Sequence, residues 1–310
     1  MTALRGIPAA LTAAALLVPA AGSARGWHGH RHGGHDINVT TNGSGDPTSC
    51  DQIQVSIAGQ PAARAEERIT VAEGRDALRI VAARNSGVQV RGTDRRDFEV
   101  LACKAAPSES ALSAIRLDNS GGEVTVKGPQ SESEWVAYLI VSAPRGASLD
   151  VEATNGPIGL SGLSGAVSAH AENGPISIRD SGGDIQADAQ NGPINVRGDS
   201  GRVRVHTQNG PIGVSLTGSA WSGDGLEASA VNGPIRLAIP DNYGSGAVVE
   251  SLGHSPWSCH GKACTDARRG GDDEGRRMEL GAGPALIRVS TRNGPVSIAS
   301  GAAADDDDDE

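Results

Sequence analysis

Apolar and small residues recur at fixed distances from the tripeptide Asn-Gly-Pro, which occurs six times in the chain. In every copy, the residues six, four and two positions before the Asn, and three and five positions after it, are aliphatic or threonine. The residues between these positions are mostly polar. This alternation with a period of two predicts strands that bury one face and expose the other. The copies begin at Asn155, Asn173, Asn191, Asn209, Asn232 and Asn293.

Successive copies are separated by 18, 18, 18, 23 and 61 residues. A second turn, rich in Ser and Gly, divides the 18-residue unit, as at 181–183, so each unit holds two short strands. One unit cannot bury its apolar face alone, whereas parallel stacking at about 4.8 Å aligns every apolar column. We therefore predict an all-β fold, a parallel β-solenoid (β-helix or β-roll) with 18-residue, two-strand rungs.

The Asn-Gly-Pro turns are expected to be architectural. Asn and Gly tolerate a positive φ where the chain reverses. Pro lacks an N–H and suits a corner or the first residue of a strand. Stacked Asn side chains can also hydrogen-bond along the corner as a ladder. A turn residue that recurs in every repeat is therefore expected to support the fold, not to mark an active site.

The pattern divides the chain into five expected segments. Residues 1–24 form a signal peptide, 25–48 a His/Gly-rich linker, and 49–112 an N-terminal β region. Residues 113–300 form the solenoid, with a loop excursion at about 253–275, and 301–310 form an acidic disordered tail. Weaker repeats near Asn85 and Asn119 leave open whether residues 36–110 belong to the solenoid.

The first 24 residues have the pattern of a secretory signal. Arg5 is followed by an apolar stretch at 7–21 and by the small residues at 22–24. The apolar stretch is short for a membrane span, although an uncleaved anchor remains the alternative. We expect an exported protein of the periplasm, cell surface or medium, with no membrane span after signal cleavage.

The cysteines agree with export, since disulfides persist outside the cytoplasm. Four cysteines allow three pairings. We expect Cys259–Cys264, which closes a small loop, and Cys50–Cys103, which clamps the N-terminal arm to the body. The alternative for the first pair is a metal site formed with His254 and His260.

Composition and charge exclude several classes of protein. The chain has 310 residues with 43 Gly and only 2% aromatic residues, which is unusual for helical bundles and dinucleotide-binding domains. The net charge is −10, and six of the negative charges come from residues 305–310, which leaves −4 for the rest. No basic stripe is evident, so a nucleic-acid partner is not expected.

No set of residues predicts a specific chemistry. The sequence shows no Ser-His-Asp set, phosphate-binding loop or dinucleotide fingerprint, so we predict no catalytic residues and no cofactor. The weak candidates for metal binding are His28, His30, His32 and His35, which more simply belong to a flexible linker. An alternative function is that of a polysaccharide-active lyase or hydrolase. Its charged groups would come from Asp180, Asp184, Asp188, Asp199, Arg179, Arg197 and Arg202.

The turns and the 18-residue spacing, together with the segment Val-Asn-Gly-Pro-Ile-Arg-Leu at 231–237, resemble a bacterial β-strand-repeat family labelled "putative adhesin". The resemblance covers roughly residues 70–300. It implies a β-solenoid and transfers no catalytic or binding residue, because fold alone does not decide function.

The expected function is that of a non-enzymatic envelope or surface protein, an adhesin-like interaction scaffold with glycan or protein partners. A polysaccharide-active enzyme and a self-assembling structural module are the alternatives. A groove in which Trp221 and Trp257 meet an acid cluster would favour the enzyme.

Overall fold

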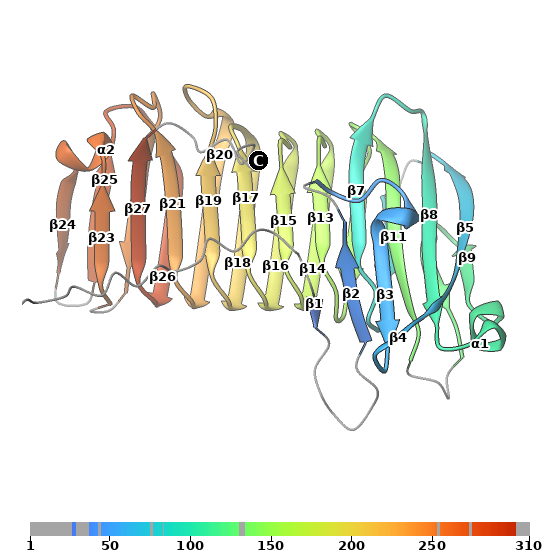
Figure 1. The fold of residues 1–310 in the computed structure, drawn as a ribbon. Coiled ribbons are helices and arrows are strands. Elements are labelled where there is room, and N and C mark those ends of the chain that lie inside the picture. Colours follow the sequence, from blue (N-terminus) through green and yellow to red (C-terminus); the bar gives the residue numbers. More distant parts are fainter. Residues whose placement is uncertain are drawn as a thin grey trace, which may run out of the picture.

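The computed structural model describes residues 27–28, 37–42, 45–74, 77–82, 84–129, 134–252, 255–272 and 275–301. Strands in these ranges form a 12-stranded sheet, an 11-stranded sheet and a 4-stranded sheet, called here sheet 1, sheet 2 and the small sheet. The prediction of an all-β fold is confirmed. The two long sheets form a flat, elongated sandwich, and the small sheet lies near one end of it (Figure 1).

Sheet 1 is parallel from β22 to β10 and antiparallel at both edges. Its order is β24 (Arg268–Asp272), β25 (Gly275–Leu280), β22 (Gly246–Ser251), β26 (Ala285–Asn293), β20 (Ser222–Asn232), β18 (Ser200–Asn209), β16 (Asp184–Asn191), β14 (Ala166–Asn173), β12 (Leu149–Ala153), β6 (Leu78–Ala82), β10 (Glu123–Lys127) and β9 (Arg116–Ser120).

Sheet 2 is parallel from β23 to β11 and ends in two antiparallel strands. Its order is β23 (Trp257–His260), β27 (Val296–Gly301), β21 (Ile235–Pro240), β19 (Ile212–Leu216), β17 (Ile194–Gly198), β15 (Ile176–Arg179), β13 (Ile158–Ser161), β7 (Val88–Thr93), β11 (Val136–Pro144), β8 (Asp97–Ala106) and β5 (Ala63–Ala72).

Apolar residues at the same position of successive repeats pair directly with each other on adjacent parallel strands. Each Asn-Gly-Pro copy follows a strand of sheet 1 and precedes a strand of sheet 2. Ile176 and Ile194 are direct partners, as are Ile194 and Ile212, and all three side chains are 0% exposed. Burial of each such side chain stabilises the fold by about 1.5–3 kcal/mol, so repeated columns supply a core without many aromatic residues.

The six turn Asn side chains form one hydrogen-bonded ladder. The Nδ2 groups of Asn173, Asn191, Asn209, Asn232 and Asn293 each donate to the Oδ1 of the Asn in the repeat beside it, at 2.9–3.0 Å, and the ladder ends at Asn155. Each inner amide therefore donates one bond and accepts another. The ladder ties adjacent repeats in a single register.

The tolerance of Asn and Gly for a positive φ does not explain these residues at the turns. None of the six Asn residues, nor the Gly after each, has a positive φ. A Cβ on Gly192 would lie 2.1 Å from the carbonyl oxygen of Gly174, and the other five glycines meet a backbone oxygen at 1.9–2.2 Å. Glycine is required there because the backbones of neighbouring repeats approach too closely for a side chain.

The sixth copy lies out of sequence order. Its strands β26 and β27 pair directly with β20 and β21 of the fifth copy. The intervening residues form β22, β25 and β24 beyond β26, and β23 beyond β27. The region expected as a loop at 253–275 thus includes β23, the short helix α2 (Lys262–Thr265) and β24. This segment covers one end of the parallel stack.

The opposite end of the stack is built from the N-terminal part of the chain. β6 and β7 pair with β12 and β13, in register with the first Asn-Gly-Pro repeat. The boundary expected at residue 112 therefore does not coincide with a break in either sheet. The helix α1 (Glu109–Ser113) packs against β5 and β8 at this end.

The small sheet consists of β1 (Trp27–His28), β2 (Ile37–Thr41), β3 (Ile53–Ile57) and β4 (Gln60–Pro61). Its apolar side chains pack on the outer face of β8 and β11, where Leu101 and Tyr138 belong to the same buried cluster. The 3₁₀ helix η1 (Cys50–Gln52) places Cys50 for its disulfide with Cys103 in β8. Cys259 and Cys264 form the second disulfide, so both bonds are the expected pairs.

Several predicted features lie outside the described residues: the signal segment 1–24, His30, His32, His35, His254 and the acidic run Asp305–Glu310. For His28 only the backbone in β1 is described. None of the helices in the described ranges is long and apolar enough to cross a membrane.

Candidate functional site

The charged residues considered for an enzyme do not converge on one site, although Arg202 forms an ion pair of 3.7 Å with Asp184. Asp184, Asp188 and Arg202 project from the outer face of sheet 1, whereas Arg179 and Arg197 project from the outer face of sheet 2. Asp180 and Asp199 lie in turns that follow β15 and β17. Since the core of the sandwich separates the two faces, these groups cannot form one acid-base site.

The outer face of sheet 2 carries arginines without matching acids. The outward residues of β7, β13, β15, β17, β19, β21 and β27 include Arg91, Arg179, Arg197 and Arg236 but no Asp or Glu. Arg179 and Arg197 are direct partners on adjacent strands. Like charges at such positions repel. The arrangement therefore concentrates positive charge on one face of a chain whose net charge is −10.

These arginines border a shallow groove of about 540 Å³ on sheet 2. Arg179, Arg197 and Arg236 line it, together with four residues whose side chains are buried, Ile178, Val196, Val214 and Leu237. The other lining residues are small: Ser177, Asn195, Gly213, Ser215, Ala238, Ser297 and Ala299. We call this the arginine groove. Its hydroxyl and amide groups can hydrogen-bond, and its lining contains no aromatic ring.

Two of the three groove arginines lack an ionic partner. Within the described residues, neither Arg197 nor Arg236 forms an ion pair or a side-chain hydrogen bond. Arg179 donates to Asp46 at 3.3 Å. Both unpaired guanidinium groups are therefore available to an anionic ligand, which an arginine can bind through two parallel hydrogen bonds.

The outer face of sheet 1 differs because its charges alternate in sign. Glu227 of β20 lies in register with Arg204 on one side and Arg288 on the other. Arg79 of β6 forms ion pairs of 2.8–3.1 Å with acids on the neighbouring strands: Glu123, Asp150 and Glu152. Charge on sheet 1 is thus largely compensated, unlike that of the arginine groove.

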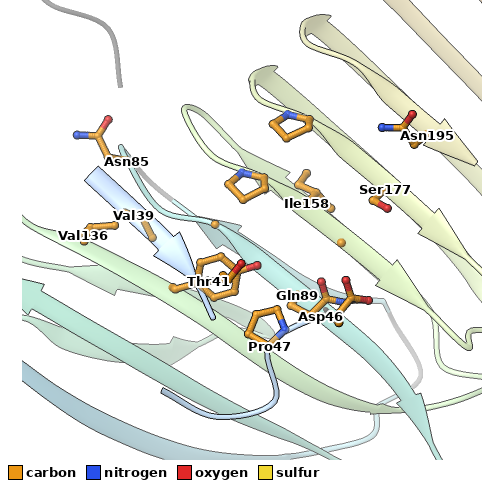
Figure 2. A pocket seen from close by; sticks show the side chains of 16 residues that line it. Val39, Thr41, Asp46, Pro47, Asn85, Gln89, Val136, Ile158, Ser177 and Asn195 are labelled. Atoms are coloured by element: carbon orange, nitrogen blue, oxygen red, sulfur yellow. The ribbon is translucent and has the colours of Figure 1, made fainter. Parts of the chain in front are cut away.

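A second concave site lies beneath the small sheet. This cavity of about 330 Å³ is bounded by the small-sheet segment on one side and by β7, β11 and β13 on the other (Figure 2). Its lining is mainly apolar and includes Val39, Val136 and Tyr138 together with three prolines, Pro47, Pro157 and Pro175. Ser177 and Asn195 line both this cavity and the arginine groove, so the two sites adjoin.

Asp46 connects the small-sheet segment to the floor of the cavity. One carboxylate oxygen accepts a hydrogen bond from Gln89 Nε2 at 3.1 Å, and the other accepts the bond from Arg179. Gln89 is only 3% exposed and lies across Gly159, where a Cβ would be 1.9 Å from Gln89 Oε1. The missing side chain at Gly159 therefore lets Gln89 reach Asp46. Figure 2 shows these two polar side chains side by side.

The tryptophans proposed as a test of an enzyme groove do not line either site. Trp221 is buried in the core and donates from Nε1 to the Gly201 carbonyl at 2.9 Å. Trp257 lies in β23 near the end of sheet 2 and packs against the core.

Tyr243 has a raised pKa of about 12. Its burial is the larger cause, and the negative charge of Asp199 is the smaller one. The phenol is therefore protonated at neutral pH.

Metal-ligand sets are not found among the described residues, where no group of three or more His, Cys, Asp or Glu side chains converges. Cys259 and Cys264, considered as ligands, are joined to each other. His260 lies in β23 beside them.

Sequence reasoning missed the arginine groove. Arg179, Arg197 and Arg236 are separated by 18 and 39 residues, and the overall charge of the chain is negative. The signal that could have revealed it is the position of each arginine within its repeat. Arg179 and Arg197 lie three residues after the Ile that follows Asn-Gly-Pro, and Arg236 lies one residue after it. Both positions alternate with buried residues and therefore face outward.

Comparison with known proteins assigns no family. No protein-family profile and no curated protein sequence matches the chain. Similar solved structures include a candidate cell adhesion protein from Clostridium sporogenes, with 10% identity, 77% of this chain and 100% of that chain covered, and a TM-score of 0.28. A candidate adhesin from Bacteroides fragilis has 13% identity, coverages of 77% and 97%, and a TM-score of 0.30.

A candidate lipid binding protein from Parabacteroides distasonis has 8% identity, coverages of 76% and 96%, and a TM-score of 0.29. Scores this low do not establish a shared fold. The function is therefore inferred from the residues of this chain alone.

Proposed function

We propose that the chain is an exported, non-enzymatic β-solenoid scaffold whose arginine groove binds a carboxylate-bearing polysaccharide at the cell surface or in the envelope. The observation that carries this proposal is the set Arg179, Arg197 and Arg236 above a floor of small polar residues on strands that contribute no outward acid.

The solenoid interpretation is supported by the register of the repeats. Asn-Gly-Pro copies that are 18 residues apart pair strand to strand in both long sheets, and the Asn ladder follows the same order. Export is supported by the signal-like segment and by two disulfides, which are typical of oxidising compartments. Resemblance to the adhesin-like repeat family remains part of this proposal.

The chemistry of the groove favours an acidic glycan. Guanidinium groups bind carboxylates bidentately, and the serine and asparagine side chains can hydrogen-bond sugar hydroxyls. Single-stranded nucleic acid is less well matched, because its binding relies on aromatic side chains that stack with bases. The extended, shallow form of the groove suits a chain more than a small molecule.

The groove also differs from the sites of the two alternative functions. Glycoside hydrolysis uses two carboxyl groups that flank the scissile bond, and the strands of the groove supply none. End-to-end self-assembly would proceed by pairing of exposed edge strands, which charged side chains discourage. Here antiparallel strands form three of the four sheet edges, and the charged strand β5 is one of them.

Binding of polygalacturonate, compared with neutral dextran of similar length, tests the proposal. We expect calorimetric binding of polygalacturonate that weakens with salt, because exposed ion pairs are screened. The variant Arg197→Gln/Arg236→Gln should lose about tenfold or more in affinity, since each lost guanidinium removes charge-assisted hydrogen bonds. It leaves the Arg179–Asp46 contact intact.

The matched control is Arg288→Gln/Arg292→Gln, which removes the same charge from exposed positions on sheet 1. Equal losses in both double variants would reduce the effect to nonspecific charge. Equally tight binding of single-stranded DNA would contradict a glycan site. New reducing ends or unsaturated products would overturn the non-enzymatic assignment.

A further inference from the structure

We infer that the acidic segment Asp305–Glu310 binds the arginine groove of its own chain and there competes with an anionic polymer. The docking itself follows from the charges and the register of sheet 2. Only the identity of the competing polymer rests on the proposed function.

The acidic segment leaves the sandwich from the correct sheet. It follows β27, whose last residue, Gly301, is the register partner of Pro240 in β21. β21 carries Arg236 and borders the groove, and Ser297 and Ala299 of β27 line the groove themselves. The chain therefore continues from one wall of the site that it is inferred to occupy.

A row of small residues connects this exit point to the arginines. Ala299 pairs with Ala238, Ala238 with Ser215, Ser215 with Arg197, and Arg197 with Arg179. The side chains between the exit point and the two arginines are thus short. An extended segment can cross the strands along this row without meeting a bulky side chain.

The length of the segment is sufficient. Nine residues, 302–310, follow Gly301, and an extended chain of this length spans roughly 30 Å. β15 is four strands away from β27, which corresponds to about 19 Å at the usual strand spacing. The carboxylates can therefore reach Arg236, Arg197 and Arg179.

Charge selects this face over the others. Residues 305–310 are all acidic, and the arginine groove combines unpaired guanidinium groups with no acid on its own strands. On sheet 1, Asp184, Asp224 and Glu227 would repel the segment. The acids Asp180, Asp199 and Asp241 lie in turns at the strand ends, so the segment is expected on the sheet face and not over these turns.

Because the acidic segment and the arginine groove belong to the same chain, weak contacts between them suffice for docking. A tethered segment is present at millimolar effective concentration, so several exposed ion pairs that are individually weak can together populate the docked state. An external polymer must displace the segment. The affinity measured for that polymer is lowered accordingly.

Zero-length carbodiimide crosslinking in the full chain tests the docking directly, because it joins a carboxylate to an amine in contact. The variants Arg236→Lys and Arg197→Lys place an amine in the groove, and Arg288→Lys places one on sheet 1 as the matched control. We expect mass spectrometry to find peptides that join residues 305–310 to positions 236 and 197, with yields that fall at high salt. Equal yields at position 288, or none at 236 and 197, would overturn the inference.

Neutralising the segment tests the competition. A full-length variant with Asp305–Asp309→Asn and Glu310→Gln should bind polygalacturonate severalfold more tightly than the original chain. Crosslinks at 236 and 197 without any polysaccharide binding would leave the docking in place and remove the proposed function. Polysaccharide binding with an unchanged affinity in the neutralised variant would remove the competition.

Discussion

Arg179 of β15 donates a hydrogen bond of 3.3 Å to Asp46, which lies 133 residues earlier in the chain. The bond joins the small-sheet segment to β15 at the place where the apolar cavity meets the arginine groove. It compensates one of the two adjacent arginines and leaves Arg197 without an ionic partner. A single long-range contact therefore lies where the apolar cavity and the cationic groove adjoin.

Substitution of a glycine in the Asn-Gly-Pro turn should be severe. In Gly192→Ala, the new Cβ would lie 2.1 Å from the Gly174 carbonyl oxygen, which belongs to the backbone and cannot rotate away. We expect a loss of roughly 2–4 kcal/mol in the free energy of unfolding, measured with urea. Gly146→Ala is the control, since nothing lies within 4 Å of its Cβ position, and a loss of similar size there would contradict the explanation.

The asparagine ladder should contribute in proportion to the hydrogen bonds removed. Asn191 donates to Asn173 and accepts from Asn209, whereas Asn293 at the end of the ladder makes only one such bond. We expect Asn191→Ala to cost about 1 kcal/mol and Asn293→Ala about half of that. Chemical denaturation of both variants measures the difference. Identical costs would contradict a contribution in proportion to the number of ladder bonds.

Removal of the long-range disulfide should destabilise the chain more than removal of the short one. Cys50–Cys103 spans 53 residues and Cys259–Cys264 spans 5. In the chain-entropy account, Cys50→Ala/Cys103→Ala should cost about 4 kcal/mol and Cys259→Ala/Cys264→Ala about half of that. Hydrogen exchange should rise in β2 and β3 only in the first variant. Unchanged protection there would mean that packing alone holds the small sheet.

The pair Glu67–Lys104 should make stability depend on pH in the acidic range. Burial alone would raise the pKa of Glu67, but hydrogen bonds from the Lys104 ammonium and the Leu117 amide outweigh it and lower the pKa below 4.5. A lowered pKa means that the stabilisation is present above the unfolded-state pKa and is lost as the pH falls through the folded-state pKa.

Glu67→Gln should therefore flatten the pH dependence of unfolding below about pH 5. It should also cost about 2 kcal/mol at neutral pH, because Lys104 is buried and keeps only the Ile115 carbonyl as a partner. Glu66→Gln changes an exposed neighbour and should do neither. A retained acid dependence in Glu67→Gln would assign it to other carboxylates.

Repeat spacing and side-chain alternation were sufficient to predict several local features. The apolar columns pair as expected, the six Asn side chains form the ladder, and both disulfides join the expected cysteines. These features depend on a short repeat with alternating apolar and polar side chains. The spacing of the repeat in the sequence therefore specifies which residues pair on adjacent strands. The reason for Gly in each turn was not predictable, because it is the distance to a backbone oxygen of another repeat.

The sequence by itself therefore determined the all-β class, the inward columns and the positions of the turns, because each depends on residues within one or two repeats. Only the tertiary structure decided that Asn293 returns beside Asn232, that Asp46 meets Arg179, and that three distant arginines line one groove on sheet 2. Such relations depend on how segments far apart in the chain are stacked, and a linear pattern of hydrophobic and polar positions does not record that order.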